Sequence, residues 1–174
     1  PMSPEFFKCY VLDLSTELEE LSDVNTPELN GIKISHLLWA DDLVLLALDH
    51  RSLQHPIDVV HRYCSEWGLT VNIKKTAVLV FNKSGRLLKE SQTFHYGDIN
   101  VPSSKEYCYL GIVFTLSGSF ARAQDELRKK GLRAYFSLKN MIDLGSLSVP
   151  AVMKLFDALI LPVLSYGCQV WLPQ

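Results

Sequence analysis

Residues 36–46 read HLLWADDLVLL, in which two adjacent carboxylates, Asp41 and Asp42, separate two apolar runs. These runs, Ile32–Trp39 and Leu43–Leu48, predict a β-hairpin with the acidic residues at its tip. Burying two ionised carboxylates between core strands costs free energy, whereas a tip can expose them to an open cleft. There they would repel each other unless a cation neutralised them, and Mg²⁺ prefers such oxygen ligands. An ordinary hairpin turn, in which Asp is common, remains the alternative.

Hydrophobic spacing outside this stretch predicts a mixture of helices and short strands. We expect helices over about 4–22, 52–67, 120–142 and 149–160, and a helix or turn beyond Pro162. Strands are expected at 70–72, 76–81, 93–96, 99–101 and 107–115. Because the pattern becomes helical near Ser119, we predict an α+β fold with one part over 1–116 and a helical part over 117–174.

The overall composition is that of a globular protein without a basic surplus. Hydrophobic residues make up 48% and charged residues 21% of the 174 residues, and the formal net charge is −2. Because phosphate neutralisation supplies most nucleic-acid affinity, any nucleic-acid surface must be a local patch. No apolar run is long enough to span a bilayer, which predicts an intracellular protein without a membrane partner. The four cysteines lack metal-ligand spacing and lie among apolar residues, so we expect buried, reduced thiols.

The acidic stretch and four other segments resemble the reverse transcriptases of non-LTR retrotransposons. Trp39–Asp42 is similar to the aromatic-Ala-Asp-Asp box of these enzymes, and GIKISHLLWADDLVLLA (31–47) is similar to the longer sequence around it. The segments YCSEWGLTVNIKKTAVLVF (63–81) and YCYLGIVF (107–114) resemble the palm segments that follow. The segment PMSPEFFKCYVLDL (1–14) resembles the start of the palm helix, and LFDALILPVLSYGCQVW (155–171) resembles the end of the thumb. These segments occur in the family's order, and the resemblance covers nearly all of the chain.

The resemblance implies a two-metal nucleotidyl-transfer site at the hairpin. Asp41 and Asp42 match the box carboxylates, one of which binds catalytic Mg²⁺ while the other supports the site. Lys75 matches the Lys of the following palm motif, which could approach the triphosphate or donate a proton to the leaving pyrophosphate. A solvated strand edge is the alternative for Lys75. Trp39 stands where the family usually has Tyr or Phe, and its larger ring could narrow the site beside the primer terminus.

The resemblance also implies a surface for an RNA or DNA primer–template. Tyr109, Leu110 and Gly111 match the strand that supports the primer end, although a buried strand with a glycine turn is an alternative. The first thumb helix is expected to pack on the nucleic-acid backbone through a basic face formed by Arg122, Arg128, Lys129, Lys130 and Arg133. Because Asp125 and Glu126 interrupt this face, a solvated helix surface is the alternative.

In the family, another metal-binding Asp lies on a palm strand upstream of the Ser-Pro helix, and the fingers hold the incoming nucleotide. Neither is matched here, so we expect residues 1–174 to be inert alone and to bind Mg²⁺ weakly or not at all. The chain is then a fragment or truncated relative of an RNA-directed DNA polymerase, with a partial palm over 1–116 and a thumb over 117–174. The alternative is a domesticated, non-catalytic module that binds nucleic acid or protein. In either case we expect exposed sheet surface that a second copy or a protein partner covers.

Overall fold

The computed structural model describes residues 9–82 and 93–171, and its mixture of helices and antiparallel strands confirms the predicted α+β class. Contacts divide the chain into two compact units. The first comprises Pro1–Val78 and Leu88–Ser103, and the second comprises Leu79–Leu87 and Ser104–Gln174. These units differ from the ranges 1–116 and 117–174, because residues 104–116 group with the helices that follow them. The assignment of a palm and a thumb to those ranges stays a prediction.

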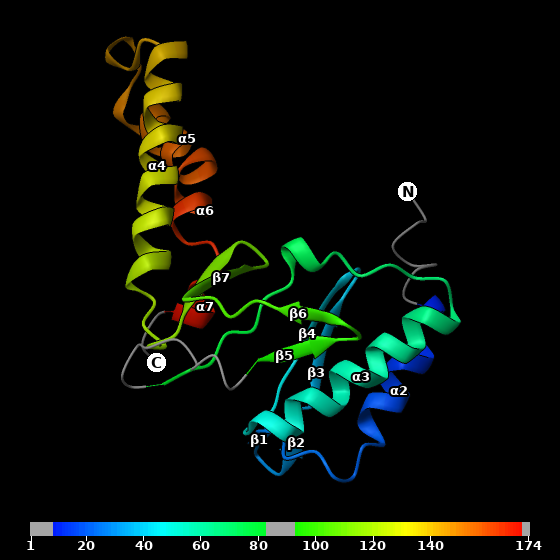
Figure 1. The fold of residues 1–174 in the computed structure, drawn as a ribbon. Helices are drawn as coiled ribbons and strands as arrows, with labels where there is room; N and C mark the ends of the chain where they lie inside the picture. Colours follow the sequence, from blue (N-terminus) through cyan, green and yellow to red (C-terminus); the bar gives the residue numbers. More distant parts are fainter. Residues whose placement is uncertain (1–8, 83–92, 172–174) are drawn as a thin grey trace. The chain divides into compact units, whose positions relative to one another are not determined.

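The core of the first unit lies between helices α2 (Leu12–Glu19) and α3 (His50–Glu66), which run close together in Figure 1. The buried residues recur at helical spacing on both helices, and they are Leu14, Leu18, Val59, Val60, Tyr63 and Cys64. Asp49 caps the start of α3, because its Oδ1 accepts a hydrogen bond from the Ser52 backbone N–H at 2.9 Å. Gly68 follows the helix with a φ of +66°, a left-handed conformation that commonly ends helices. The first residues of the helix expected over 4–22 lie outside the described part of the chain.

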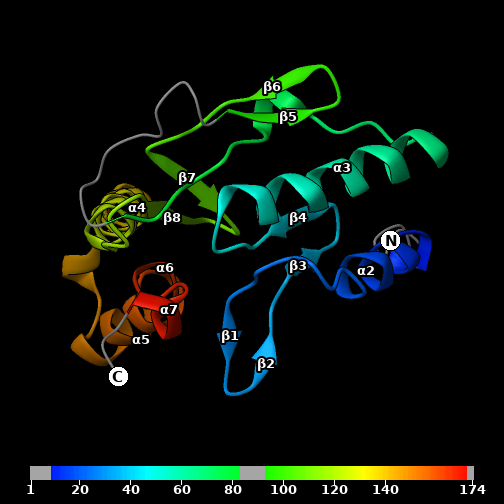
Figure 2. The ribbon, with the colours of Figure 1, turned by 60° about the horizontal axis from the view of Figure 1, so that its bottom comes forward.

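Three antiparallel hairpins also belong to the described part of the first unit (Figure 2). They pair β1 (Glu28–Leu29) with β2 (Ile32–Lys33), β3 (His36–Trp39) with β4 (Asp42–Leu45), and β5 (Phe94–Tyr96) with β6 (Ile99–Val101). Two-residue turns join each pair, and φ is positive at the first turn residue, which is Asn30, Ala40 or Gly97. Positive φ at this position suits the right-handed twist of hairpin strands.

The second unit combines one hairpin with a set of helices. The hairpin is β7 (Glu106–Tyr109) with β8 (Ile112–Thr115), and the chain continues into the long helix α4 (Ala121–Met141). The 3₁₀ turn η3 (Leu144–Ser146) then leads to α5 (Val149–Leu159), α6 (Leu161–Leu164) and α7 (Cys168–Trp171). Figure 1 shows α4 alongside α5 and α6, and Gly131 of α4 lies directly against Leu164 of α6. These bounds confirm the helices predicted over about 120–142 and 149–160.

Three expectations from the sequence are wrong. Residues 70–72 and 76–81 form no strand: they flank the 3₁₀ helix η1 (Ile73–Lys75), and only Val78 makes a β-bridge, to Ser103. The segment expected as one strand over 107–115 turns back at Leu110 and Gly111 to form the β7–β8 hairpin. The cysteines are free, but only Cys64 is buried, and Cys9 and Cys108 are exposed. Cys108 is exposed because alternate residues of β7 point outward.

No helix within the described residues is both long enough and apolar enough to cross a lipid bilayer.

Candidate functional site

The β3–β4 hairpin presents the two predicted carboxylates at its closed end. Trp39 pairs with Asp42, so the turn consists of Ala40 and Asp41, and Asp42 is the first residue of β4. Both carboxylate side chains are exposed, as is the ring of Trp39. Ala40 has a φ of +52°, which is strained for a residue with a Cβ atom. The prediction of a hairpin with acids at its tip is therefore confirmed. The predicted first strand over Ile32–Trp39 is divided, because Ile32–Lys33 pairs with β1 and only His36–Trp39 belongs to this hairpin.

The open end of this hairpin is attached to the helical core of the first unit. Leu43 and Leu45 of β4 pack against the buried cluster of α2 and α3. His36 of β3 lies between two hydroxyl groups: its Nε2 is 2.8 Å from Ser15 Oγ on α2, and its Nδ1 is 2.9 Å from Ser35 Oγ. Burial lowers the pKa of His36, and the nearby Glu19 carboxylate partly opposes this shift. The hairpin base is thus fixed by packing and hydrogen bonds, while its tip is solvated.

The carboxylate oxygens at the hairpin tip suit a hard divalent cation whose coordination sphere is completed by other ligands. Asp41 and Asp42 supply carboxylate oxygens, and both are accessible to an ion. Among the described residues, no three His, Cys, Asp or Glu side chains come together as a metal site. Mg²⁺ commonly takes one or two carboxylates from the protein and fills its other positions with water and substrate phosphates. The residues present therefore fit a Mg²⁺ ion that is held jointly with a phosphate substrate.

Lys75 also belongs to the first unit. It is the last residue of η1, and its side chain is exposed. The short 3₁₀ turn is closed by two backbone hydrogen bonds, from Lys75 N–H to Asn72 O at 3.0 Å and from Thr76 N–H to Ile73 O at 3.1 Å. Lys75 therefore lies on a turn, and the alternative of a solvated strand edge is wrong.

The β7–β8 turn contains a second strained residue. Leu110 has a φ of +47° and Gly111 has a φ of +80°, the pattern of a type I′ turn that usually takes Asn and Gly. The Tyr166 hydroxyl donates a hydrogen bond to the Leu110 carbonyl oxygen at 2.9 Å. Tyr166 was not predicted as a site residue, since 56 positions separate it from Leu110 and no local pattern links them. Backbone strain of this kind is often found at functional sites.

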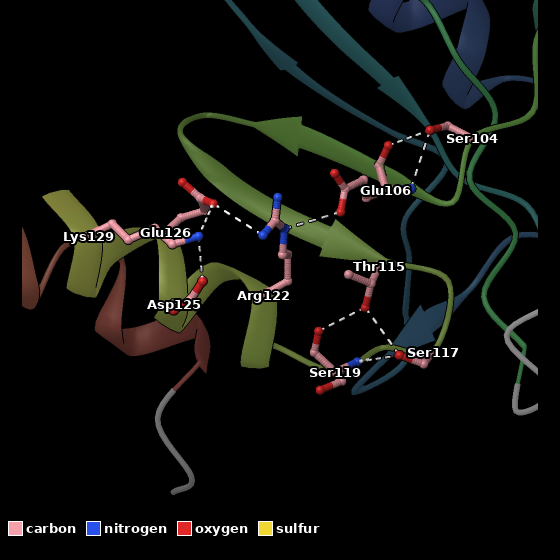
Figure 3. Close-up of polar contacts among 9 residues, drawn as sticks. All are labelled: Ser104, Glu106, Thr115, Ser117, Ser119, Arg122, Asp125, Glu126 and Lys129. Atoms are coloured by element: carbon pink, nitrogen blue, oxygen red, sulfur yellow. Dashed lines mark hydrogen bonds and ion pairs between the residues drawn. The ribbon is translucent and has the colours of Figure 1, made fainter.

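The predicted basic residues of α4 fall into two groups, and Figure 3 shows Arg122 and Lys129 of the first group. Arg122 lies between Glu106 at 3.5 Å and Glu126 at 3.3 Å. Arg128 and Lys129 pair with Asp125 at 2.9 Å and 2.7 Å. Hydrogen bonds from Lys129 and then Arg128 lower the pKa of Asp125, and the bond to Asp125 raises the pKa of Lys129. These three cations are thus already compensated by carboxylates.

Lys130 and Arg133 form the second group. Both side chains are exposed, and neither makes an ion pair with any other described residue. Lys130, together with Gly111 of the β7–β8 turn and Arg122, lines a cavity of about 280 Å³ between this hairpin and α4. As a whole, α4 carries six basic and two acidic side chains, a surplus of four positive charges in a chain whose net charge is −2. Helix α4 therefore carries a local surplus of positive charge, which a nucleic-acid surface on this chain would need.

The sequence comparison decides the family. Residues 1–114 match the family described as reverse transcriptase (RNA-dependent DNA polymerase). This chain is a member of the reverse transcriptase family. The matched residues include the Trp39–Asp42 hairpin, Lys75 and the Tyr109–Gly111 turn, whereas α4 begins beyond them. Enzymes of this family typically use a divalent metal ion and a nucleic-acid substrate.

Several transposon proteins are relatives of this reverse transcriptase chain. A transposon-derived protein of Caenorhabditis elegans is 31% identical over 150 residues, which cover 82% of this chain and 50% of that protein. The Pol polyprotein of the type-1 retrotransposable element R1 3 of Nasonia vitripennis is 25% identical over 148 residues, covering 78% and 38%. The Pol polyprotein of the type-2 element R2DM of Drosophila melanogaster is 32% identical over 124 residues, covering 68% and 11%. These elements are non-LTR retrotransposons, and the chain spans half or less of each relative. No solved structure matches the chain significantly.

Proposed function

We propose that this chain is the part of a non-LTR reverse transcriptase that supplies the acidic hairpin of the nucleotidyl-transfer site and a backbone-binding helix for the primer–template. The exposed Asp41 and Asp42 pair at a hairpin tip, within the matched residues, carries the proposal. Residues 1–116 then correspond to part of a palm, and residues 117–174 correspond to a thumb. We expect the 174-residue chain to bind nucleic acid without extending a primer by itself.

The proposed chemistry at the hairpin is that of phosphoryl transfer. When bound, Mg²⁺ neutralises negative charge on the phosphates and on the attacking oxygen. Asp41 and Asp42 would hold the ion from a turn whose strand register fixes both positions. Lys75 would contact the triphosphate or donate a proton to the leaving pyrophosphate. Trp39, exposed beside Asp42, would border the primer terminus.

A Mg²⁺ titration followed by NMR tests the metal site. We expect the amide signals of residues 40–43 to shift on addition of Mg²⁺, and an Asp41→Asn/Asp42→Asn double variant to abolish these shifts. The matched control is Glu19→Gln/Glu20→Gln, because it removes an exposed, adjacent acidic pair from the end of α2 in the same unit. Equal loss in both double variants would contradict a metal role for the hairpin.

The proposed backbone-binding helix predicts a salt dependence that separates the two groups of α4 cations. The logarithm of the association constant falls linearly with the logarithm of the salt concentration, and each lost phosphate contact makes this slope shallower by about 0.9. We expect Lys130→Gln and Arg133→Gln each to reduce this slope, since their side chains have no carboxylate partner among the described residues. Arg128→Gln is the matched control: Arg128 is already paired with Asp125, so we expect its loss to leave the slope unchanged.

Primer extension separates the enzyme part from a domesticated binding module. With Mg²⁺ and deoxynucleotides, we expect no extension by residues 1–174, because Asp41 and Asp42 alone leave the metal site incomplete. Extension that Asp41→Ala abolishes would show this expectation to be wrong. Nucleic-acid binding that ignores Mg²⁺ and the Asp41→Asn/Asp42→Asn change would instead favour the non-catalytic module, with which the acidic net charge is compatible.

The proposed function includes coverage of exposed apolar surface by a partner. Helix α5 has no buried residue, and Val149 and Met153 on it are 75% and 54% exposed. Large exposed apolar patches often mark surfaces that bind another protein. We therefore expect a homo-oligomer or a bound protein partner. Size-exclusion chromatography that gives a single monomer of 19.7 kDa at all concentrations would contradict the homo-oligomer.

A further inference from the structure

We infer that two copies of this chain associate through α5, which packs antiparallel against α5 of the second copy. This inference rests on the proposed function, because it selects a second copy as the partner of the apolar surface described there and gives the orientation of that copy. The residues that carry the inference all lie in the second unit.

The first observation is an exposed apolar stripe along α5. Val149, Met153 and Phe156 stand at positions i, i+4 and i+7, so they lie on one side of the helix. Their side chains are 75%, 54% and 37% exposed. Val152 and Leu155, on the other side of α5, are half-buried. The stripe is thus a continuous apolar surface that the described residues leave accessible to water.

The second observation is a pair of opposite charges beside this stripe. Lys154 and Asp157 are the charged residues of α5, and both are exposed. Neither makes an ion pair or a hydrogen bond with any described residue. Helix α5 therefore has no surplus of positive charge, which a nucleic-acid partner would require. An apolar stripe with one unpaired charge of each sign suits another protein surface.

The third observation is that α5 is complementary to itself. In an interface with two-fold symmetry, if one residue faces a second residue across the axis, the second faces the first in the same way. An antiparallel register that places Met153 opposite Phe156 of the second copy keeps the two stripes in contact. In this register Lys154 is offset from Asp157 of the second copy by two residues, or about 3 Å along the helix.

Both charges lie on the same flank of the stripe, and the two-fold axis brings this flank of one copy against the same flank of the other. The symmetric contact therefore contains the ion pair between Lys154 and Asp157 twice. A second copy thus supplies the apolar partner for the stripe and the missing partner for each charge. For this reason we assign the surface to a second copy.

The length of α5 sets the expected strength of the dimer. Eleven residues form a helix about 16 Å long. This helix offers less than the roughly 800 Å² that each partner buries in a standard protein interface. We therefore expect a weak dimer, with a dissociation constant on the order of 10 μM or higher.

Charge reversal tests the antiparallel contact. Sedimentation equilibrium of the 174-residue chain measures the dissociation constant. We expect Lys154→Glu and Asp157→Lys each to raise it by roughly tenfold or more, because either change creates two like-charged pairs in the symmetric dimer. Lys139→Glu is the matched control, because Lys139 is an exposed lysine of α4 in the same unit. It should change the constant by less than about twofold, and the melting temperature of each variant confirms that it folds.

Mixing the two single variants provides the decisive measurement. A pair made of one Lys154→Glu copy and one Asp157→Lys copy has opposite charges at both contacts, so we expect the mixture to associate within about threefold of the wild type. The double variant Lys154→Glu/Asp157→Lys should associate equally well, because it exchanges the two signs. A parallel arrangement would show no such recovery, since Lys154 would not face Asp157 of the other copy.

The outcomes separate this inference from the proposed function. A wild-type chain that stays monomeric at all concentrations overturns the α5 contact together with the proposed homo-oligomer, and it leaves the face to a different protein. The proposed metal and nucleic-acid roles have their own tests and are not affected by that result. If the wild type dimerises but the single reversals do not weaken the dimer, or mixing does not restore it, only the α5 contact is overturned.

Discussion

Trp39 and Asp42 are the last cross-strand pair of the β3–β4 hairpin, and both side chains are exposed at its tip. Directly opposed residues of an antiparallel pair lie on the same face, so the indole ring and the second carboxylate are neighbours. Asp41 occupies the turn between them. If Asp42 binds a metal ion as proposed, the Trp39 ring on the same face can contact the substrate that this ion holds. This relationship makes Trp39 the aromatic side chain to test first.

We expect Trp39→Ala to weaken nucleic-acid binding without weakening the fold. The side chain is 63% exposed, so the free energy of unfolding should change by about 0.5 kcal/mol or less. Loss of a base-stacking contact should cost about 1–3 kcal/mol of binding free energy. Urea denaturation and fluorescence anisotropy measure the two quantities.

Trp67→Ala is the matched control for Trp39→Ala. Trp67 packs against Tyr63 and Tyr10 with ring centroids 5.8 Å and 5.5 Å apart. Its loss should lower stability more than Trp39→Ala and should leave affinity unchanged. The reverse ranking in stability, or equal losses of affinity, would show that Trp39 is an ordinary surface residue.

Gly131 provides a test of the packing between α4 and α6. Alanine is better than glycine in a helix interior by about 1 kcal/mol, which favours Gly131→Ala. However, the new Cβ would collide with the Leu164 side chain, and overpacking typically costs about 1–3 kcal/mol. We expect Gly131→Ala to lower stability by about 1 kcal/mol. The double variant Gly131→Ala/Leu164→Ala should lose less stability than the sum of the losses in the two single variants. Strict additivity of the single and double variants in urea denaturation would contradict this contact.

The elements with strong local signals could be predicted from the sequence. The two apolar runs on either side of Asp41 and Asp42 predict the β3–β4 hairpin, since both strands and their turn are contiguous in the chain. The helical spacing of apolar residues predicts the long helix α4. Asp125 lies three positions before Arg128 and four before Lys129, and this spacing indicates which part of the basic face is neutralised. In each case the deciding contacts lie within a few residues of one another.

The features that could not be predicted depend on partners distant in sequence. Residues 76–81 have strand composition, but a strand needs a neighbour along its length, and only Val78 finds one, at Ser103. The hydrogen bond from Tyr166 to Leu110 joins residues 56 positions apart. Whether Cys108 is buried depends on the face that β7 turns outward, which a one-residue change of register would invert.

Ala40 allows the strain in the acidic turn to be measured. Its φ of +52° is unfavourable for alanine and readily adopted by glycine. We expect Ala40→Gly to raise the free energy of unfolding by up to about 1 kcal/mol, since glycine's larger entropy loss offsets part of the relief. Gly68→Ala makes the opposite change at a φ of +66° with no atom within 4 Å of the new Cβ, so it should lower stability by a similar amount. Lower stability in Ala40→Gly would show that the turn is not strained.

His36 should make the stability of the first unit depend on pH. Its pKa is lowered from 6.5 by burial, with the Glu19 carboxylate as the opposing charge. The unfolded chain therefore takes up a proton at a higher pH than the folded chain does. The stabilising contribution is complete above pH 6.5, declines as the pH falls below 6.5, and is lost once the pH has passed the lowered folded pKa.

We expect the urea midpoint to be lower at pH 5.5 than at pH 7.5, and His36→Gln to reduce that difference. If His36→Gln and the wild type lose equal stability between the two pH values, the proton uptake that destabilises the protein occurs elsewhere.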